Sequence, residues 1–363
     1  MTNQASSSSS SSSLLSSLGS VLPHFSLHRA TNVLPKRHPA LQKFESRLAE
    51  KLEALKLAGE ELGFLSIDWF LQSMTVVLAS HSNVEALIPD LQFPLSDKDD
   101  KWMDEYLNDS AKLLDVCNVL KEGISDVEHY QMLVQVALVN LDNRESFSEA
   151  KYHRARNALQ DCKEAIKTKD TEYKQGQPKS KLENCSSMLR TMGEKLVNPK
   201  GIKGNGFLNA IYGAKVTTIF LCGLLVIALA CKPKRPLVNL SVTNQYLWSS
   251  SLLSLQHTVK EETDKRKNGG SIALLCELDS VDSSVRRLHQ LIDRNLLEKK
   301  FPLDKDQAGE LRQLVEDLSK NSAHLGSGLG PLEQYVNELF RILIDSRLAL
   351  LDILSKSKKR QAI

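Results

Sequence analysis

The sequence lacks an excess of charge of either sign. Lysine and arginine number 47 and aspartate and glutamate number 44, which leaves a formal net charge of +3 on 363 residues. So small an imbalance offers no broad attraction to a phosphate backbone, and we expect no nucleic-acid partner. Hydrophobic residues make up 41% of the chain, which is enough to form a sizeable core.

Cysteines are few and widely spaced, and they never form a C-x-x-C pair. This spacing predicts buried free thiols rather than a disulfide framework. The histidines likewise do not pair with cysteines or carboxylates at metal-ligand spacing, apart from His24 and His28, which lie four residues apart near the N-terminus. We therefore expect no metal site and no cofactor, and we identify no catalytic residue. The six cysteines are Cys117, Cys162, Cys185, Cys222, Cys231 and Cys276.

A nucleotide-binding loop is also missing. Residues 201–206 (GIKGNG) and 326–330 (GSGLG) are rich in glycine, but neither follows a strand or has the Walker pattern, so both are predicted to be flexible linkers. No segment alternates with period two over a length that predicts a sheet. Only residues 237–242 have the pattern of a strand, and a single strand forms no sheet.

What the sequence has in abundance is helical periodicity. From Leu41 onward, apolar residues recur at spacings of three and four, which aligns them on one face of each helix. Ser125/Glu128, Ser146/Glu149 and Ser180/Glu183 fit the capping box, which marks a helix start. Helices are predicted over about 41–55, 66–87, 100–124, 128–141, 147–168, 181–196, 216–231, 248–264, 272–294, 306–321 and 332–354.

These helices predict an all-α fold, an elongated antiparallel bundle with one strongly apolar helix. Residues 1–38 are rich in serine and carry no acidic residue, a composition typical of a transit peptide and also of an ordinary disordered tail. The expected organisation is this tail, an N-terminal helical region over 39–197, a loop with the apolar helix over 198–236, a C-terminal helical region over 237–355 that packs on the first, and a basic tail over 356–363.

The apolar helix covers residues 216–231, sixteen residues without a charge between Lys215 and Lys232. Its length of roughly 24 Å is short of the ~30 Å hydrocarbon core of a bilayer. Two structures fit it: a single membrane span, which would make the protein membrane-associated, or a core helix buried on all sides, with the chloroplast or the cytoplasm as the location. The candidate membrane residues are Val216, Phe220, Leu224, Leu225, Ile227 and Cys231.

Several segments resemble the plant BYPASS family. The resemblance is strongest in PLSDKDDKW and YLNDSAKLLDVCN, within residues 90–120, and continues in SIDWF (66–70), LNAIYGAKV (208–216) and SRLALL (346–351). It implies a non-enzymatic developmental regulator that restrains a root-derived mobile signal able to arrest shoot growth. Related plant proteins are linked to the exocyst, so the resemblance also implies an alternative, an adaptor of the secretory machinery.

One surface within the resemblance is a candidate for protein binding. Asp97, Asp100, Trp102 and Tyr106 lie at or near the start of the helix predicted at residue 100. The alternative is that Trp102 and Tyr106, four residues apart, are core anchors of that helix. The expected partner is thus a protein, exocyst-related in the secretory alternative, with membrane contact through the apolar helix.

Overall fold

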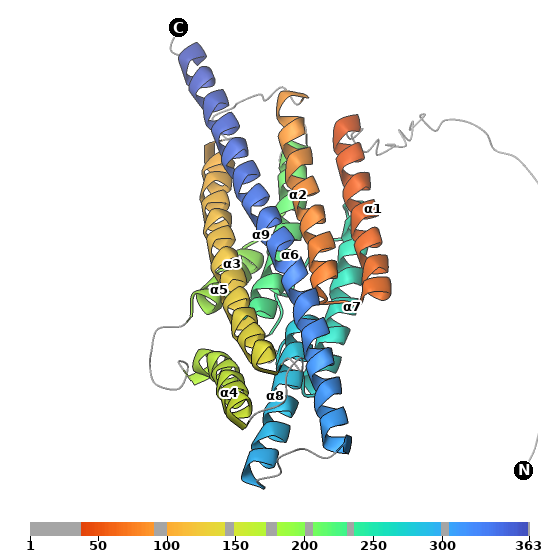
Figure 1. The fold of residues 1–363 in the computed structure, drawn as a ribbon. Coiled ribbons are helices and arrows are strands. Elements are labelled where there is room, and N and C mark those ends of the chain that lie inside the picture. The colour runs from red at the N-terminus through yellow and green to blue at the C-terminus, as the bar shows by residue number, and fades with distance from the viewer. Residues whose placement is uncertain are drawn as a thin grey trace, which may run out of the picture. The chain divides into compact units, whose positions relative to one another are not determined.

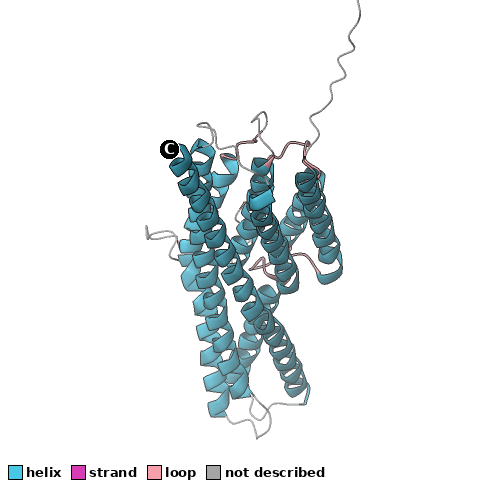
Figure 2. Ribbon diagram, turned by 90° about the horizontal axis from the view of Figure 1, so that it is seen from above, coloured by secondary structure: helices cyan, strands magenta, loops and turns pink. Residues whose placement is uncertain are grey.

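Helices account for nearly all of the described structure, a computed structural model in which residues 38–90, 100–141, 149–171, 180–199, 206–230, 236–298 and 305–361 are described (Figure 1). The described helices belong to one compact unit, residues 37–363. Every described element is a helix or a loop (Figure 2), which confirms the all-α prediction. The helices are α1 (Pro39–Leu62), α2 (Ile67–Asp90), α3 (Asp100–Leu141), α4 (Glu149–Thr171), α5 (Lys181–Glu194), α6 (Phe207–Leu229), α7 (Ser249–Asn268), α8 (Cys276–Leu297) and α9 (Lys305–Gln361).

Helix α6 is the core helix of this unit, packed against α1, α2, α3 and α5. Every residue from Val216 to Leu229 is buried, which is what a helix with no polar face requires in water. It is the one helix of the described residues long and apolar enough to cross a membrane, and 89% of its most apolar stretch is buried inside the protein. A single helix of this kind is weak evidence for a membrane span. The candidate membrane residues Val216, Phe220, Leu224, Leu225 and Ile227 are all in this core, while Cys231 lies outside the described residues.

Helix α3 corrects the sequence prediction, because it runs without a break through the capping box expected at Ser125 and Glu128. The physical reason is that its buried face keeps the helical period across this point, so packing outweighs the local cap signal. The buried residues on this face are Val116, Leu120, Ile124, Val127, Tyr130, Val134, Ala137 and Leu141.

Helix α9 is a second correction, since the glycine-rich segment 326–330 and Pro331 lie inside it rather than in a linker. Two of the glycines serve close packing. A Cβ atom at Gly328 would lie 2.2 Å from Cγ1 of Ile67, and one at Gly326 would lie 2.0 Å from Nε2 of Gln131. These positions allow α9 to approach α2 and α3, and Figure 1 shows α9 running between them.

Other predictions have mixed outcomes. Ser180 caps α5 as expected, with its hydroxyl oxygen accepting a hydrogen bond from the Glu183 amide at 3.3 Å. Residues 237–242 form no strand. The five cysteines in the described residues are free, and all but the half-buried Cys276 are buried, which confirms the thiol prediction there. His24, His28, Ser146, Cys231, residues 1–37 and residues 201–205 lie outside the described residues.

Candidate functional site

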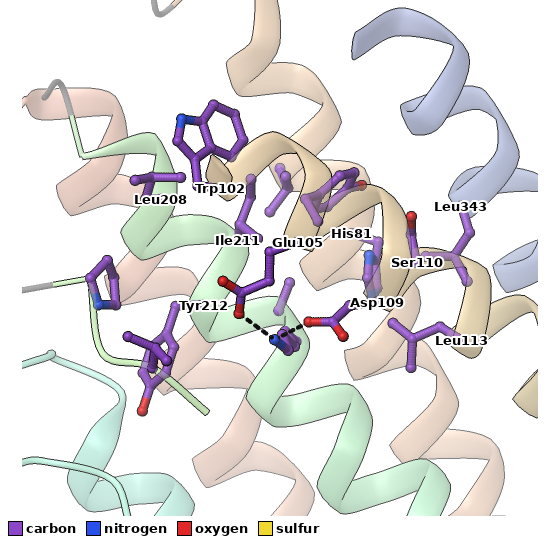
Figure 3. Close-up of a pocket in the computed structure, with 16 residues that line it drawn as sticks. His81, Trp102, Glu105, Asp109, Ser110, Leu113, Leu208, Ile211, Tyr212 and Leu343 are labelled. Carbon is purple, nitrogen blue, oxygen red and sulfur yellow. Dashed lines mark hydrogen bonds and ion pairs between the residues drawn. The ribbon is translucent and has the colours of Figure 1, made fainter. Parts of the chain in front are cut away.

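A pocket opens between α2, α3, α6 and α9, beside the segment that follows α5 (Figure 3). Its cavity volume is about 110 Å³. Most of the side chains around it are apolar, and the polar ones lie on α2, α3 and α6. The lining residues are His81, Val84, Trp102, Glu105, Tyr106, Asp109, Ser110, Leu113, Val197, Pro199, Leu208, Ile211, Tyr212, Ala214, Lys215 and Leu343.

A small ion-pair cluster lies on one side of the pocket. Lys215 of α6 pairs through Nζ with Oδ2 of Asp109 and, at 3.7 Å, with Oε1 of Glu105, both on α3. Lys112 also contacts Asp109, at 3.1 Å between Nζ and Oδ1. The Lys215 and Asp109 side chains are only 16% and 13% exposed, so each charge depends on the other for compensation. The cluster therefore fixes α6 against α3 at the level of the pocket.

His81 of α2 also lines the pocket, as a neutral ring. It is 6% exposed, and burial lowers its pKa from 6.5 to about 4. Its Nε2 lies 2.8 Å from Oγ1 of Thr218 on α6, and that hydroxyl donates to the carbonyl oxygen of Ala214 at 2.8 Å. Because the hydroxyl proton is committed to Ala214, Thr218 accepts from His81, which places the ring proton on Nε2.

Trp102 and Tyr106, predicted to be either a partner surface or core anchors of their helix, both line this pocket. Trp102 is half-buried, and its ring meets Phe207 edge-on with the centroids 6.3 Å apart. Tyr106 is half-buried too, and burial raises its pKa to about 12 against the opposing effect of a hydrogen bond with Ser346. Asp100 is the first residue of α3, but its side chain and all of Asp97 lie outside the described residues.

The polar residues of the pocket were not predicted as site residues from the sequence. Lys215 was noted only as a flank of the apolar helix, and His81 was one of the histidines that pair with no cysteine or carboxylate at metal-ligand spacing. A signal was present for the carboxylates, because Glu105 and Asp109 are four residues apart and so share one face of a helix. Nothing in the sequence indicated that α2 brings His81 to the same place, since that depends on helix packing.

Two of the segments that carry the family resemblance meet at this pocket. Six residues between 102 and 113 of α3 and five between 208 and 215 of α6 line it. The comparisons with known proteins agree with the resemblance, since the family described as Protein ROH1-like matches residues 22–184 and 179–354. The chain belongs to the ROH1-like family. The family match thus covers nearly the whole length of the chain.

Three curated relatives illustrate the relationship. Protein BPS1, chloroplastic, from Arabidopsis thaliana is 29% identical over 334 residues, which are 91% of this chain and 88% of the relative. UPF0496 protein 4 from Oryza sativa subsp. japonica is 34% identical over 268 residues, 73% of this chain, and the match spans 56% of the rice protein. Protein ROH1D from Arabidopsis thaliana is 24% identical over 366 residues, 90% of this chain and 91% of the relative. No solved structure matches this ROH1-like chain.

Among the described residues, no three histidine, cysteine or carboxylate side chains gather in a way that could hold a metal ion. The relatives are named as BPS1, ROH1 and UPF0496 proteins, and none of these names denotes an enzyme. Chemically, the site offers a sheltered apolar space, one neutral histidine and a compensated ion-pair cluster.

Proposed function

We propose that this ROH1-like protein is a non-enzymatic developmental regulator that restrains the production of a root-derived mobile signal able to arrest shoot growth. The observation that carries the proposal is the match to BPS1 (BYPASS1), which extends over 91% of this chain and 88% of the relative. Similarity over whole chains means that the helical bundle itself, and not one shared motif, is the unit that has been kept. The regulator acts by binding, through the pocket and the helix faces around it.

The proposed role is tested in plants by grafting. Plants lacking this gene and its paralogues should show arrested shoots, and their roots should arrest grafted wild-type shoots. Expression of the wild-type chain in the rootstock should restore growth. Normal shoots in the plants lacking all paralogues would overturn the proposal, since no signal would then need restraint.

We infer that α6 serves as the core of the bundle and does not insert into a membrane. The nine valine, isoleucine, leucine and phenylalanine residues of its segment Val216–Leu229 would gain roughly 3–5 kcal/mol on insertion, at about 0.3–0.6 kcal/mol each. Withdrawing the helix exposes the apolar faces of the helices packed on it. Each large apolar side chain of these neighbours that is left in water costs about 1.5–3 kcal/mol, so roughly three of them already offset the gain on insertion. The packed state is therefore favoured by the larger of the two terms.

The proposed location is the chloroplast. The support is the acid-free, serine-rich composition of residues 1–38, together with the printed name of BPS1, which includes the word chloroplastic. Residues 1–38 fused to a fluorescent protein should direct it into plastids, and the full chain without them should remain in the cytosol. A fusion that stays cytosolic would remove this location from the proposal.

A second candidate function is an adaptor of the secretory machinery. The observation that favours it is the family match itself, because ROH1D and ROH1A are among the relatives and the resemblance links related plant proteins to the exocyst. Crosslinking in intact cells followed by purification of the tagged chain should then recover exocyst subunits. As a control, the same procedure with a tagged exocyst component should recover the other subunits. If it does, and none is recovered with this chain, the adaptor function is excluded and the signalling role remains.

A further inference from the structure

The pocket contains one polar group that the protein itself leaves unsatisfied. The side chain of His81 is only 6% exposed, and the hydrogen bond described for it uses Nε2 only. The proton lies on Nε2, because Thr218 donates its own proton to Ala214 and accepts from the ring. Among the described residues, Nδ1 therefore has no partner, and it presents a lone pair. Figure 3 shows the ring among the side chains that line the pocket.

An acceptor in an apolar space selects its ligand by chemistry. A ligand that supplies an N–H or O–H group to Nδ1 gives this acceptor a partner that the described residues do not provide. The charged side chains do not compete for this role. Lys215 is occupied by Asp109 and Glu105, and these carboxylates repel an anionic ligand from the same side of the pocket.

The size of the pocket sets the second requirement. An engineered apolar cavity of about 150 Å³ in another protein binds benzene. The cavity here, at about 110 Å³, has a volume of the same order and is open at its mouth. Apolar side chains from four helices form its walls, among them Val84, Leu113, Ile211 and Leu343. One ring or a short branched chain fits inside, and any longer part extends through the mouth.

We propose that this pocket is a binding site for a small, uncharged molecule with a ring-sized apolar body and one N–H or O–H donor, which hydrogen-bonds to Nδ1 of His81. The inference goes beyond the developmental role, because it assigns a ligand class to a site and holds whichever pathway the protein regulates. It also gives the pocket a reason to keep a neutral histidine where an apolar residue would pack as well.

The test uses two probes of nearly equal shape, indole and benzothiophene, titrated by calorimetry into the purified full-length chain at pH 7.5. Indole carries an N–H donor and benzothiophene carries none. We expect saturable binding of one indole per chain, and a dissociation constant for benzothiophene that is larger by about 2- to 13-fold, the factor that corresponds to one hydrogen bond of 0.5–1.5 kcal/mol. Failure of indole to saturate a single site, or equal binding of the two probes, would overturn the proposal.

Two variants locate the site. His81→Phe should abolish the preference for indole while benzothiophene still binds, and Ile211→Trp should fill the cavity and prevent binding of both. Leu57→Trp is the matched control, because Leu57 is 59% exposed on α1 and does not line the pocket. Its binding should equal that of the wild type. Indole binding that survives in a folded Ile211→Trp protein would place the site elsewhere and refute the assignment.

Discussion

The neutral state of His81 predicts a specific loss of stability in mild acid. Its pKa is about 4 in the folded protein and near 6.5 when unfolded, because burial disfavours the charged ring. Above pH 6.5 both states are neutral and the residue contributes no pH dependence. As the pH falls below 6.5 the unfolded state takes up a proton that the folded state excludes, so stability is lost progressively until about pH 4.

The magnitude follows from the two pKa values. Between pH 7.5 and pH 5, proton uptake by the unfolded state lowers the free energy of unfolding by about 2 kcal/mol, and by about 3 kcal/mol once the pH is below 4. The charged groups that line the pocket with His81 are Glu105, Asp109 and Lys215, which compensate one another as a cluster. Desolvation is therefore the cause to test.

The assay is denaturant unfolding of the wild type and of His81→Gln at pH 7.5 and pH 5. Glutamine keeps a side-chain N–H donor for Thr218 but does not titrate. Because every other group titrates equally in both proteins, the variant should lose about 2 kcal/mol less than the wild type over this interval. Parallel losses in the two proteins would show that His81 accepts a proton freely when folded, and would refute the buried, neutral ring.

Three further predictions concern packing and can be checked by denaturant unfolding. Gly328→Ala should destabilise the protein by about 1–2 kcal/mol because its methyl group meets a buried isoleucine of α2, whereas Gly309→Ala, with open space around it in the same helix, should stabilise it by up to about 1 kcal/mol. Lys215→Met should cost about 2–3 kcal/mol by leaving Asp109 poorly compensated, and adding Asp109→Asn should recover part of the loss. Trp102→Ala should lower stability by about 2 kcal/mol through lost contact with α6, and an unchanged transition would show that the ring is a surface group. Equal effects of the two glycine changes, or an additive lysine–aspartate pair, would contradict the packing described.

How far the sequence predicts the fold depends on which signal acts at each point. Period and composition were sufficient for the helical class and for the apolar helix α6. The local cap and breaker residues were misleading at Ser125 and at Gly330–Pro331, where they predicted helix ends that the structure does not have. In both places the buried positions continue at spacings of three and four, and this long-range pattern was the better guide. In α9 it runs through Leu318, Leu325, Leu329, Leu332, Val336, Leu339 and Leu343.

The candidate site was less accessible from the sequence. Trp102 and Tyr106 were identified as either a partner surface or core anchors of their helix, and the sequence could not decide because their depth depends on how α6 and α9 cover α3. His81 and Lys215 lie 134 positions apart in the chain, and no periodicity relates them. Only the packing of α2 and α3 on α6 brings these residues to one pocket. The pattern of apolar residues in the sequence can therefore predict helices, but predicting a pocket between four helices requires knowing how the helices pack.

Helix α6 is the buried core of the helical bundle, and we propose that it does not insert into a membrane. Alkaline carbonate extraction of membranes from plants that express the tagged full-length chain tests it most directly, with an integral membrane protein as the control. We expect the chain to be released into the soluble fraction, because α6, its most apolar helix, is covered by the neighbouring helices. Retention in the pellet together with the integral control would contradict it and would make α6 a membrane span.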